Sequence, residues 1–375
     1  MTETAGIKFL LDPYGDWVKG EGLPVVEDHA VDLHKVEVGP WARLGAKGAF
    51  VHLKGRGDFV ALQVIEIPPG GKTARQRHLY DDVFYVLSGH GSATVEAAPG
   101  RVSTFEWGPQ SLFSPPLNAS FQFFNGSGSE PARLVSANNM PLVMNLFHSD
   151  AFVFDNPFAF GERAGKEAYF TGDGDFLPLK PGQHMWETNF VPDLSSFELP
   201  AWENRGTGSK NIKFILADSV MHAHTSEMAV GTYKKGHRHG PGAHVFAVSG
   251  TGYTLMWYEG DKDFTRHEWQ HGFVFTPDDG MFHQHFNTSP EPARYLALSL
   301  GSHRYPMLAR KVKRKEQPEA SVKNGGLQID YEDQDPRIHV IWLRELAKTG
   351  VPSRMGAIFD EERIARDAGL LRAAS

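Results

Sequence analysis

The sequence predicts an all-β protein made of two related barrels, with a few helices in the connections and near the C-terminus. Two observations predict this fold: the amino-acid composition of the chain and a repeat within its sequence. The chain has 375 residues, which suits two domains of about 150 residues each and leaves length for arms. It contains 39 Gly and 26 Phe, as expected of a turn-rich β protein with an aromatic core.

The repeat consists of two short blocks that recur with almost the same spacing. Glu-Pro-Ala-Arg occurs at 130–133 and again at 291–294, each time shortly after Phe-Asn. Ser-Gly-x-Gly occurs at 88–91 and at 249–252. From the first glycine to the asparagine is 36 residues in the first copy and 37 in the second. Two separated matches at nearly equal spacing indicate a duplicated domain.

Each copy has the pattern of β-structure. Stretches rich in Val, Ile, Phe, Tyr and Thr alternate with Gly, Pro and Asn turns, as in sandwiches and barrels. The predicted strands include Phe59–Ile67, Val83–Leu87, Val245–Val248, Phe273–Thr276 and Tyr295–Leu300. Two segments, Arg337–Lys348 and Asp360–Ala374, are predicted to be helices because apolar residues recur three and four positions apart.

The chain divides into four parts on this basis. Residues 1–150 hold the first barrel and residues 211–305 the second. Residues 151–210, rich in Phe, Pro and Gly, are expected to link the barrels and pack on them. Residues 306–375 leave the repeat pattern and form an arm, which can dock on another subunit or lie on the surface.

Charge and composition exclude several classes of protein. The net charge of −7 argues against nucleic acid as a partner, and we expect the basic run Arg310–Lys315 to be a solvated connection. No apolar run reaches the ~18 residues of a membrane span, and no signal peptide is evident, so a cytoplasmic protein is expected. Because the chain has no Cys, any transition metal must be held by His, Asp or Glu.

The second repeat contains a group of histidines. It reads Gly236-His237-Arg238-His239, and His283 follows in the later motif. Residues two apart on a strand share a face, so His237 and His239 can both face a barrel interior, where a third histidine would complete a triad. Neutral imidazole suits Fe, Mn, Ni, Cu or Zn, and three protein ligands leave positions open for catalysis.

This layout resembles the cupin superfamily. Its first motif is Gly, five residues, His-x-His, three or four residues, Glu, six residues, Gly; its second is Gly, five residues, Pro-x-Gly, two residues, His, three residues, Asn. By this resemblance His237, His239 and His283 are the metal ligands, Gly250 closes the first motif and Asn287 ends the second. It implies two double-stranded β-helix, or jelly-roll, barrels.

The sequence departs from the family in two ways. Around Gly272 and Pro277 the second motif differs by one residue in two of its spacings. The family's Glu position holds Ala243, so no acidic ligand is present. His244, the next residue, would ordinarily point away, but a β-bulge could bring it in as a fourth ligand. Three-His and four-His sets therefore both stay open.

Within the cupins the motifs are similar to gentisate and salicylate 1,2-dioxygenases, bicupins that hold ferrous iron with three histidines and cleave hydroxylated aromatic acids with O₂. That resemblance implies one divalent metal, most simply Fe(II), a chelating anionic small-molecule substrate, O₂ and a homo-oligomer, a dimer or tetramer. His285 matches a histidine near the substrate there, where it would orient or protonate it. In those enzymes the metal is usually in the N-terminal cupin, whereas the intact set here is C-terminal.

Other positions carry weaker signals. Trp257 follows the predicted hairpin around Gly250, and it either lines the substrate pocket or packs in the hydrophobic core. His222 and His224 share a face of a predicted strand, and we expect that strand to be exposed. The first repeat has Gln76, His78, Asp82, Phe121 and Phe123 at the motif positions, which predicts a structural barrel or one that packs in a dimer, without a transition-metal site.

Two other functions remain open from the sequence. A non-redox enzyme, such as an isomerase, decarboxylase or hydrolase, would use Mn, Ni or Zn as a Lewis acid without O₂. A small-molecule-binding protein without turnover would use the same site for binding alone. The sequence predicts a metal-dependent dioxygenase first and these two as alternatives.

Overall fold

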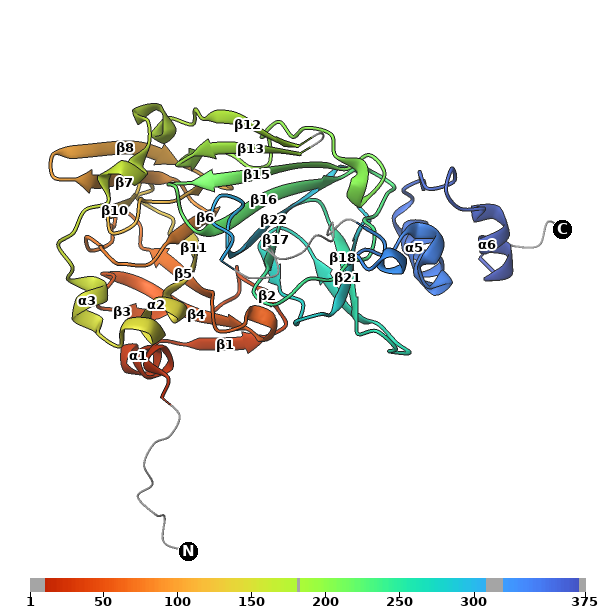
Figure 1. Ribbon diagram of the computed structural model, residues 1–375, viewed down its shortest axis with the longest axis horizontal. Coiled ribbons are helices and arrows are strands. Elements are labelled where there is room, and N and C mark those ends of the chain that lie inside the picture. Colours follow the sequence, from red (N-terminus) through yellow and green to blue (C-terminus); the bar gives the residue numbers. More distant parts are fainter. Residues whose placement is uncertain (1–10, 181–182, 308–319, 371–375) are drawn as a thin grey trace, which may run out of the picture.

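The computed structural model describes residues 11–180, 183–307 and 320–370. Two β-barrels pack face to face, and the helices lie at their outer ends (Figure 1). The basic run Arg310–Lys315 and the end of the second predicted helix lie outside the described residues.

The first barrel has a large sheet and a three-stranded sheet. The large sheet runs in the order β1-β4-β5-β11-β6-β9-β14, with β3 paired to β4, and the small sheet in the order β10-β7-β8. The strands are β1 (Val25–Asp28), β3 (Gly39–Trp41), β4 (Ala46–Leu53), β5 (Ala61–Ile67), β6 (Asp82–Ser88), β7 (Gly91–Ala98), β8 (Arg101–Trp107), β9 (Leu112–Phe113), β10 (Ser120–Asn125), β11 (Ala132–Asn138) and β14 (Phe190–Val191).

The second barrel repeats this plan. Its large sheet runs β12-β13-β15-β16-β22-β17-β20-β2, and its small sheet β19-β18-β21. The strands are β2 (Ala30–Asp32), β12 (Asp175–Lys180), β13 (Gln183–Thr188), β15 (Lys210–Leu216), β16 (Met221–Met228), β17 (His244–Ser249), β18 (Gly252–Trp257), β19 (Thr265–Trp269), β20 (Phe273–Phe275), β21 (Phe282–Asn287) and β22 (Ala293–Leu300). The prediction of a mainly β protein with two similar barrels is confirmed.

Each barrel receives one edge strand from a distant part of the chain. β2 lies before the first barrel's main strands, yet pairs with β20 of the second barrel, Val31 opposite Val274. β14 lies in the segment between the barrels and pairs with β9 of the first, Val191 opposite Leu112. The two barrels are therefore connected by exchanged strands as well as by packing.

The repeated blocks meet in the same turn of each barrel. Gly89 and Gly250 have φ of +84° and +75°, a region that favours glycine. A Cβ at Gly89 would lie 2.7 Å from that of Ala132, and one at Gly250 2.7 Å from that of Ala293. The alanine of Glu-Pro-Ala-Arg thus packs directly under the glycine, which explains why both blocks recur together.

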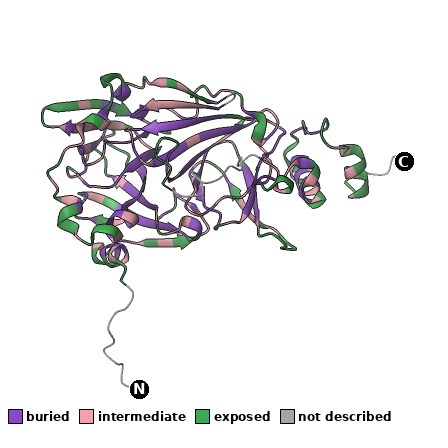
Figure 2. Ribbon diagram, viewed as in Figure 1, coloured by how far each residue is buried: buried purple, intermediate pink, exposed green. Residues whose placement is uncertain are grey.

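A shared hydrophobic core joins the two large sheets. Because successive side chains of a strand alternate between its faces, one face of β5 or β22 points into its own barrel and the other toward the neighbouring barrel. Figure 2 shows the central strands buried along most of their length. The facing core includes Leu62, Val64 and Val135 from the first barrel and Phe214, Leu296 and Leu298 from the second.

Helices cover the outer ends. The described α-helices are α1 (Pro13–Glu21), α2 (Met140–Phe147), α3 (Asp150–Phe154), α5 (Pro336–Thr349) and α6 (Glu361–Asp367). The structure confirms the helix predicted at Arg337–Lys348, and places Ile338, Trp342 and Leu346 in a cluster with Tyr253 and Phe286 of the small sheet. The second predicted helix ends earlier, at Asp367, ahead of Gly369 with its positive φ. No helix in the described ranges is long and apolar enough to cross a membrane.

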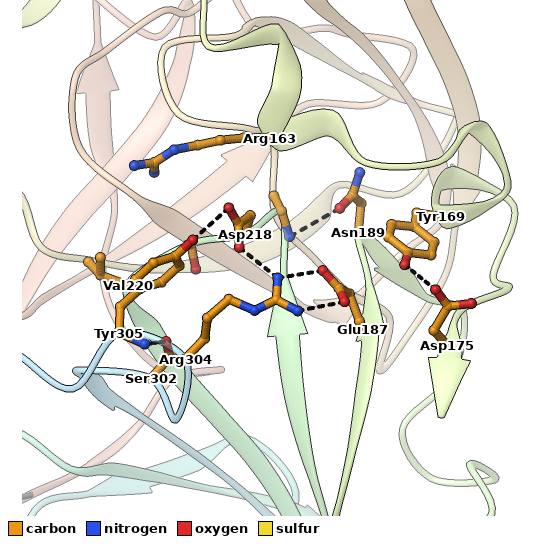
Figure 3. Close-up of polar contacts among 12 residues, drawn as sticks. Arg163, Tyr169, Asp175, Glu187, Asn189, Asp218, Val220, Ser302, Arg304 and Tyr305 are labelled. Atoms are coloured by element: carbon orange, nitrogen blue, oxygen red, sulfur yellow. Dashed lines mark hydrogen bonds and ion pairs between the residues drawn. The ribbon is translucent and has the colours of Figure 1, made fainter. Parts of the chain in front are cut away.

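An arginine fixes the chain just after β22. Arg304 donates to both carboxylate oxygens of Glu187 on β13, at 2.6 Å each, and to Asp218 at 2.7 Å. The Tyr305 hydroxyl also donates to Asp218 (Figure 3). The bidentate contact between Arg304 and Glu187 holds the chain that follows β22 against β13, a strand nearer the edge of the same sheet.

Candidate metal centre

Three histidines meet inside the second barrel. The segment before β17 approaches β21 closely enough for the backbones of His237 and His283 to exchange hydrogen bonds of 3.0 and 2.9 Å. The His283 ring lies 4.2 Å from the His237 ring and 4.6 Å from the His239 ring. Their ligand atoms lie within 4.8 Å of one another, and this is the only such group of three His, Cys, Asp or Glu side chains in the described parts of the chain.

The hydrogen bonds of these rings leave suitable donor atoms. The Nδ1 atoms of His237, His239 and His283 contact the backbone carbonyls of Lys235, Gly240 and Met281 at 3.4, 2.8 and 3.2 Å. A carbonyl can only accept, so Nδ1 carries the proton in each ring and Nε2 keeps its lone pair. Three neutral imidazoles oriented in this way fit a divalent transition metal.

Burial keeps His237 and His283 neutral. Desolvation, and then the positive charge of Arg205, holds the pKa of His237 well below its usual 6.5. Desolvation, followed by the neighbouring His239 and His285, lowers the pKa of His283 in the same direction. Neutral imidazole is the form that binds a metal, so these side chains are ready to bind at neutral pH.

Residues 327–330 of the C-terminal region hold residues 234–239, which we call the ligand segment, on the side opposite β21. The Arg238 amide donates to Leu327 at 3.0 Å, and the Ile329 amide donates to Gly236 at 2.7 Å. Lys235 forms an ion pair with Asp330 at 2.8 Å. The segment with His237 and His239 is therefore bracketed by β21 and by residues 327–330, which fixes the direction of both rings.

His285 lies next to the triad and outside it. Its ring is 5.5 Å from that of His283 and 6.2 Å from that of His237. Its Nδ1 contacts the Thr254 hydroxyl at 2.9 Å, and burial, followed by the charge of Lys234, lowers its pKa to about 3. This position suits a contact with a molecule bound at the triad.

Two other predicted residues are not brought to the triad. His244 lies on the face of β17 toward the first barrel, where its Nδ1 donates to the Gly242 carbonyl at 3.1 Å. Trp257 lies on the face of β18 toward α5, stacked on Phe282 at 5.8 Å and set against Phe264 at 5.2 Å. In this position Trp257 supports the ligand segment, since a Cβ at Gly236 would lie 3.3 Å from its ring.

Sequence reasoning did not find three cationic side chains of this barrel. Arg205 lies on a short 3-10 helix, Glu203–Arg205, whose last carbonyl accepts a hydrogen bond from Lys235. Lys234 is 1% exposed and lies within the ligand segment, and Lys213 is 8% exposed on β15. Lys213 has a usable signal, since it alternates with Ile212 and Phe214 on β15, whereas Lys234 lies between strands and Arg205 on a loop whose path no pattern reveals.

The pair His222 and His224 is inside the barrel, so the expectation of an exposed strand was wrong. β16 lies between β15 and β22 in the middle of its sheet, and its even-numbered residues face the barrel interior. His222 Nε2 and His224 Nδ1 lie 2.9 Å apart, and the ring of His303 is 5.3 Å from that of His222.

The first barrel is filled where the second has its triad. The ring of Phe121 lies 5.4 Å from that of His78, and Tyr80 stacks on His78 at 3.6 Å. His78 and Asp82 are 3.7 Å apart, yet burial lowers the pKa of His78 to about 3 and raises that of Asp82 to about 8. Both groups are thus neutral at pH 7, and the contact is not an ion pair.

Comparisons with known proteins give weak similarities. No protein-family model and no curated protein matches the sequence. Among solved structures, a formate complex of oxalate decarboxylase from Lactobacillus farciminis aligns with a TM-score of 0.48 and 11% identity, over 72% of this chain and 86% of that one. Bacillus subtilis oxalate decarboxylase, which has Mn(II) centres, aligns with a TM-score of 0.48 and 14% identity, over 74% of this chain and 78% of that one.

Proposed function

We propose that this chain is a metal-dependent enzyme of cupin type, which binds a small anionic chelating molecule in its second barrel. The observation that carries this is the triad of His237, His239 and His283, whose ligand atoms lie within 4.8 Å of one another and whose Nδ1 atoms each contact a backbone carbonyl. Three neutral ligands leave the charge of a divalent cation undiminished, which favours an anionic partner. Arg205, whose charge acts on His237, His283 and His285, adds to the same preference.

The first reaction we propose is O₂-dependent cleavage of a hydroxylated aromatic acid or a similar chelating substrate. When bound, Fe(II) would supply the redox chemistry that O₂ requires, and Mn, Ni, Cu or Zn would supply a Lewis acid. In either case the protein's own contribution is clear. Arg205 would pair with a carboxylate, His285 would orient the substrate, and the buried barrel wall would exclude water.

A non-redox decarboxylase is the second candidate, and Lys234 favours it. Burial, followed by the charge of Arg205, lowers the pKa of Lys234 to about 7. An ammonium that titrates near neutral pH could donate a proton to carbon after CO₂ leaves and be reprotonated through the Ser209 and Ser226 hydroxyls that it contacts. Lys234 also acts electrostatically on His285, which supports this role.

The test is metal analysis followed by two product assays. Protein purified without oxygen is expected to hold close to one divalent metal per chain, and His283→Gln to hold almost none. Hydroxylated aromatic acids are then screened for O₂ uptake, and the same panel with small carboxylates for CO₂ release in the absence of O₂. Uptake of O₂ supports the first reaction and anaerobic CO₂ release the second. Stoichiometric metal with neither product contradicts catalysis on these substrates, and protein that takes up no metal contradicts the whole proposal.

A further inference from the structure

The interior of the second barrel carries positive charge beyond the triad. On β15 and β16, Lys213 lies directly opposite His224 across the antiparallel ladder. The alternate residues Phe214 and Ala223 belong to the core shared with the first barrel. Since neighbours on a strand point to opposite faces, Lys213 and His224 both face the barrel interior.

Lys234 enters the same region from the ligand segment. Its Nζ donates to the hydroxyls of Ser209 and Ser226 at 2.9 Å each, and to the Glu227 carbonyl at 3.3 Å. All three acceptors are uncharged. The Glu227 carboxylate is instead held by Arg294 at 2.7 Å and by Lys210 at 3.0 Å. Burying an ammonium among neutral groups destabilises a folded protein, so a residue kept there calls for a function.

Tyr295 connects this cationic region with the metal centre. Its ring lies 5.1 Å from that of His285, 6.0 Å from that of His224 and 5.9 Å from Lys234 Nζ. Arg205 also acts electrostatically on His224, Lys234 and Tyr295, as it does on the triad. The cations and the triad thus border one region of the barrel interior.

These side chains retain accessible surface. Arg205, His224 and Tyr295 are half-buried, although they lie among fully buried neighbours. Tyr295, which lies between His285 and His224, is the link along which a small molecule bound at the triad would reach them. A substrate with one anionic group would be satisfied by the metal and Arg205, and would make no use of Lys213 and Lys234.

We propose that Arg205, Lys213, Lys234 and His224 form a second anion subsite, and that the substrate is a small molecule with two anionic groups. One group lies at the triad and the other at this subsite; the assignment of the first rests on the proposed function. The second group is a carboxylate or a phosphate, because a guanidinium and two ammonium groups recognise both. A bound anion would keep Lys234 in its charged form and offset the mutual repulsion of the three cations.

The test is calorimetric binding of three probes, butanoate, succinate and phosphoglycolate, to Zn(II)-loaded and metal-free protein. The Zn(II)-loaded protein is expected to bind succinate at least tenfold more tightly than butanoate. Lys213→Met should reduce this ratio to near one, whereas Lys213→Arg should preserve it. Lys210→Met is the matched control, because Lys210 lies on the same strand with an exposed side chain paired to Glu227, and it should leave the ratio unchanged. A preference for phosphoglycolate over succinate would identify the second group as a phosphate, and the reverse as a carboxylate.

Two outcomes overturn the subsite. One is equal binding of succinate and butanoate by the unmodified protein, and the other is the same effect from Lys210→Met as from Lys213→Met. Thermal unfolding checks each variant, and Arg205→Met replaces Lys213→Met if the latter does not fold. Metal-free protein that still prefers succinate in a Lys213-dependent way supports the subsite even if metal-dependent turnover is never found, so the two proposals can fail separately.

Discussion

His237 and Gln328 lie side by side in an antiparallel bridge, although one belongs to the metal-binding motif and the other to the C-terminal region. On its opposite side His237 bridges to His283. The backbone that carries the first ligands is thus held between two neighbours. Rings fixed in this way need little reorganisation when a metal binds, which favours affinity.

Removing one backbone hydrogen bond between residues 327–330 and the segment that carries His237 should weaken metal binding. Ile329→Pro deletes the N–H that donates to Gly236, and we expect a loss of metal affinity of about tenfold, as for other groups that support a metal ligand. Ile329→Ala is the matched control, since it shortens the side chain and keeps the donor. Competition with a metal-sensitive dye measures both. Equal affinities of the two variants would show that residues 327–330 do not position the ligands.

The ligand set itself can be counted by substitution. His283→Gln should lower the affinity for Zn(II) by about 100-fold or more, because it removes a direct ligand. His244→Asn should leave affinity within about twofold of the unmodified protein, since its ring donates to Gly242 on the face toward the first barrel. Titration calorimetry distinguishes the two. A large loss in His244→Asn would establish the four-histidine set that the sequence left open.

Metal affinity should depend little on pH between 6 and 8. Three histidines with a pKa near 6.5 would lose roughly 70-fold in affinity over this range, as protons compete with the metal. Here burial lowers the pKa of His237 and His283 well below 6.5, so both stay neutral until the pH falls further. We expect a change of about fourfold or less, because at most one of the three imidazoles then competes with protons over this range. A tenfold loss per pH unit below 7 would mean that His237 and His283 are not held neutral by burial.

The first barrel should become less stable as pH rises through the range of Asp82. Burial raises the pKa of this carboxyl from 3.8 to about 8, so the folded state binds its proton more tightly than the unfolded state does. Between pH 4 and pH 8 the free energy of unfolding therefore falls as pH increases. Asp82→Asn removes this dependence and can still accept the hydrogen bond from Ser136.

The expected result is a Tm difference that grows with pH. Asp82→Asn should match the unmodified protein near pH 5 and exceed its Tm by about 2 °C or more at pH 8.5. Calorimetry at both values makes the comparison, and the contribution of His78, which is common to both proteins, cancels. A difference that is constant or shrinks with pH would mean that Asp82 is charged in the folded protein.

Much of the fold could be predicted from the sequence, because alternation, turn residues and the internal repeat are local patterns. The same-face spacing of His237 and His239 is also local, whereas the choice of His283 as the third member rested on the resemblance to the cupin motifs. The position of Arg205 could not be predicted from the sequence, because it depends on the path of the loop formed by residues 199–210. The expectation that His222 and His224 lie on an exposed strand was wrong for a related reason. Alternation indicates which residues share a face of a strand, but it does not say whether that face is exposed.

The exchanged strands β2 and β14 make each barrel depend on the other. A barrel that has filled its own interior with Phe121 and Tyr80 gains nothing from metal chemistry and would be expendable if it stood alone. Here it receives β14 from the connecting segment, and β2 from its own half completes the sheet of the barrel that holds the triad. Deleting either half would strip an edge from the other. Each barrel therefore depends on the other for an edge strand, and the copy without the histidine triad is a structural part of the copy that has it.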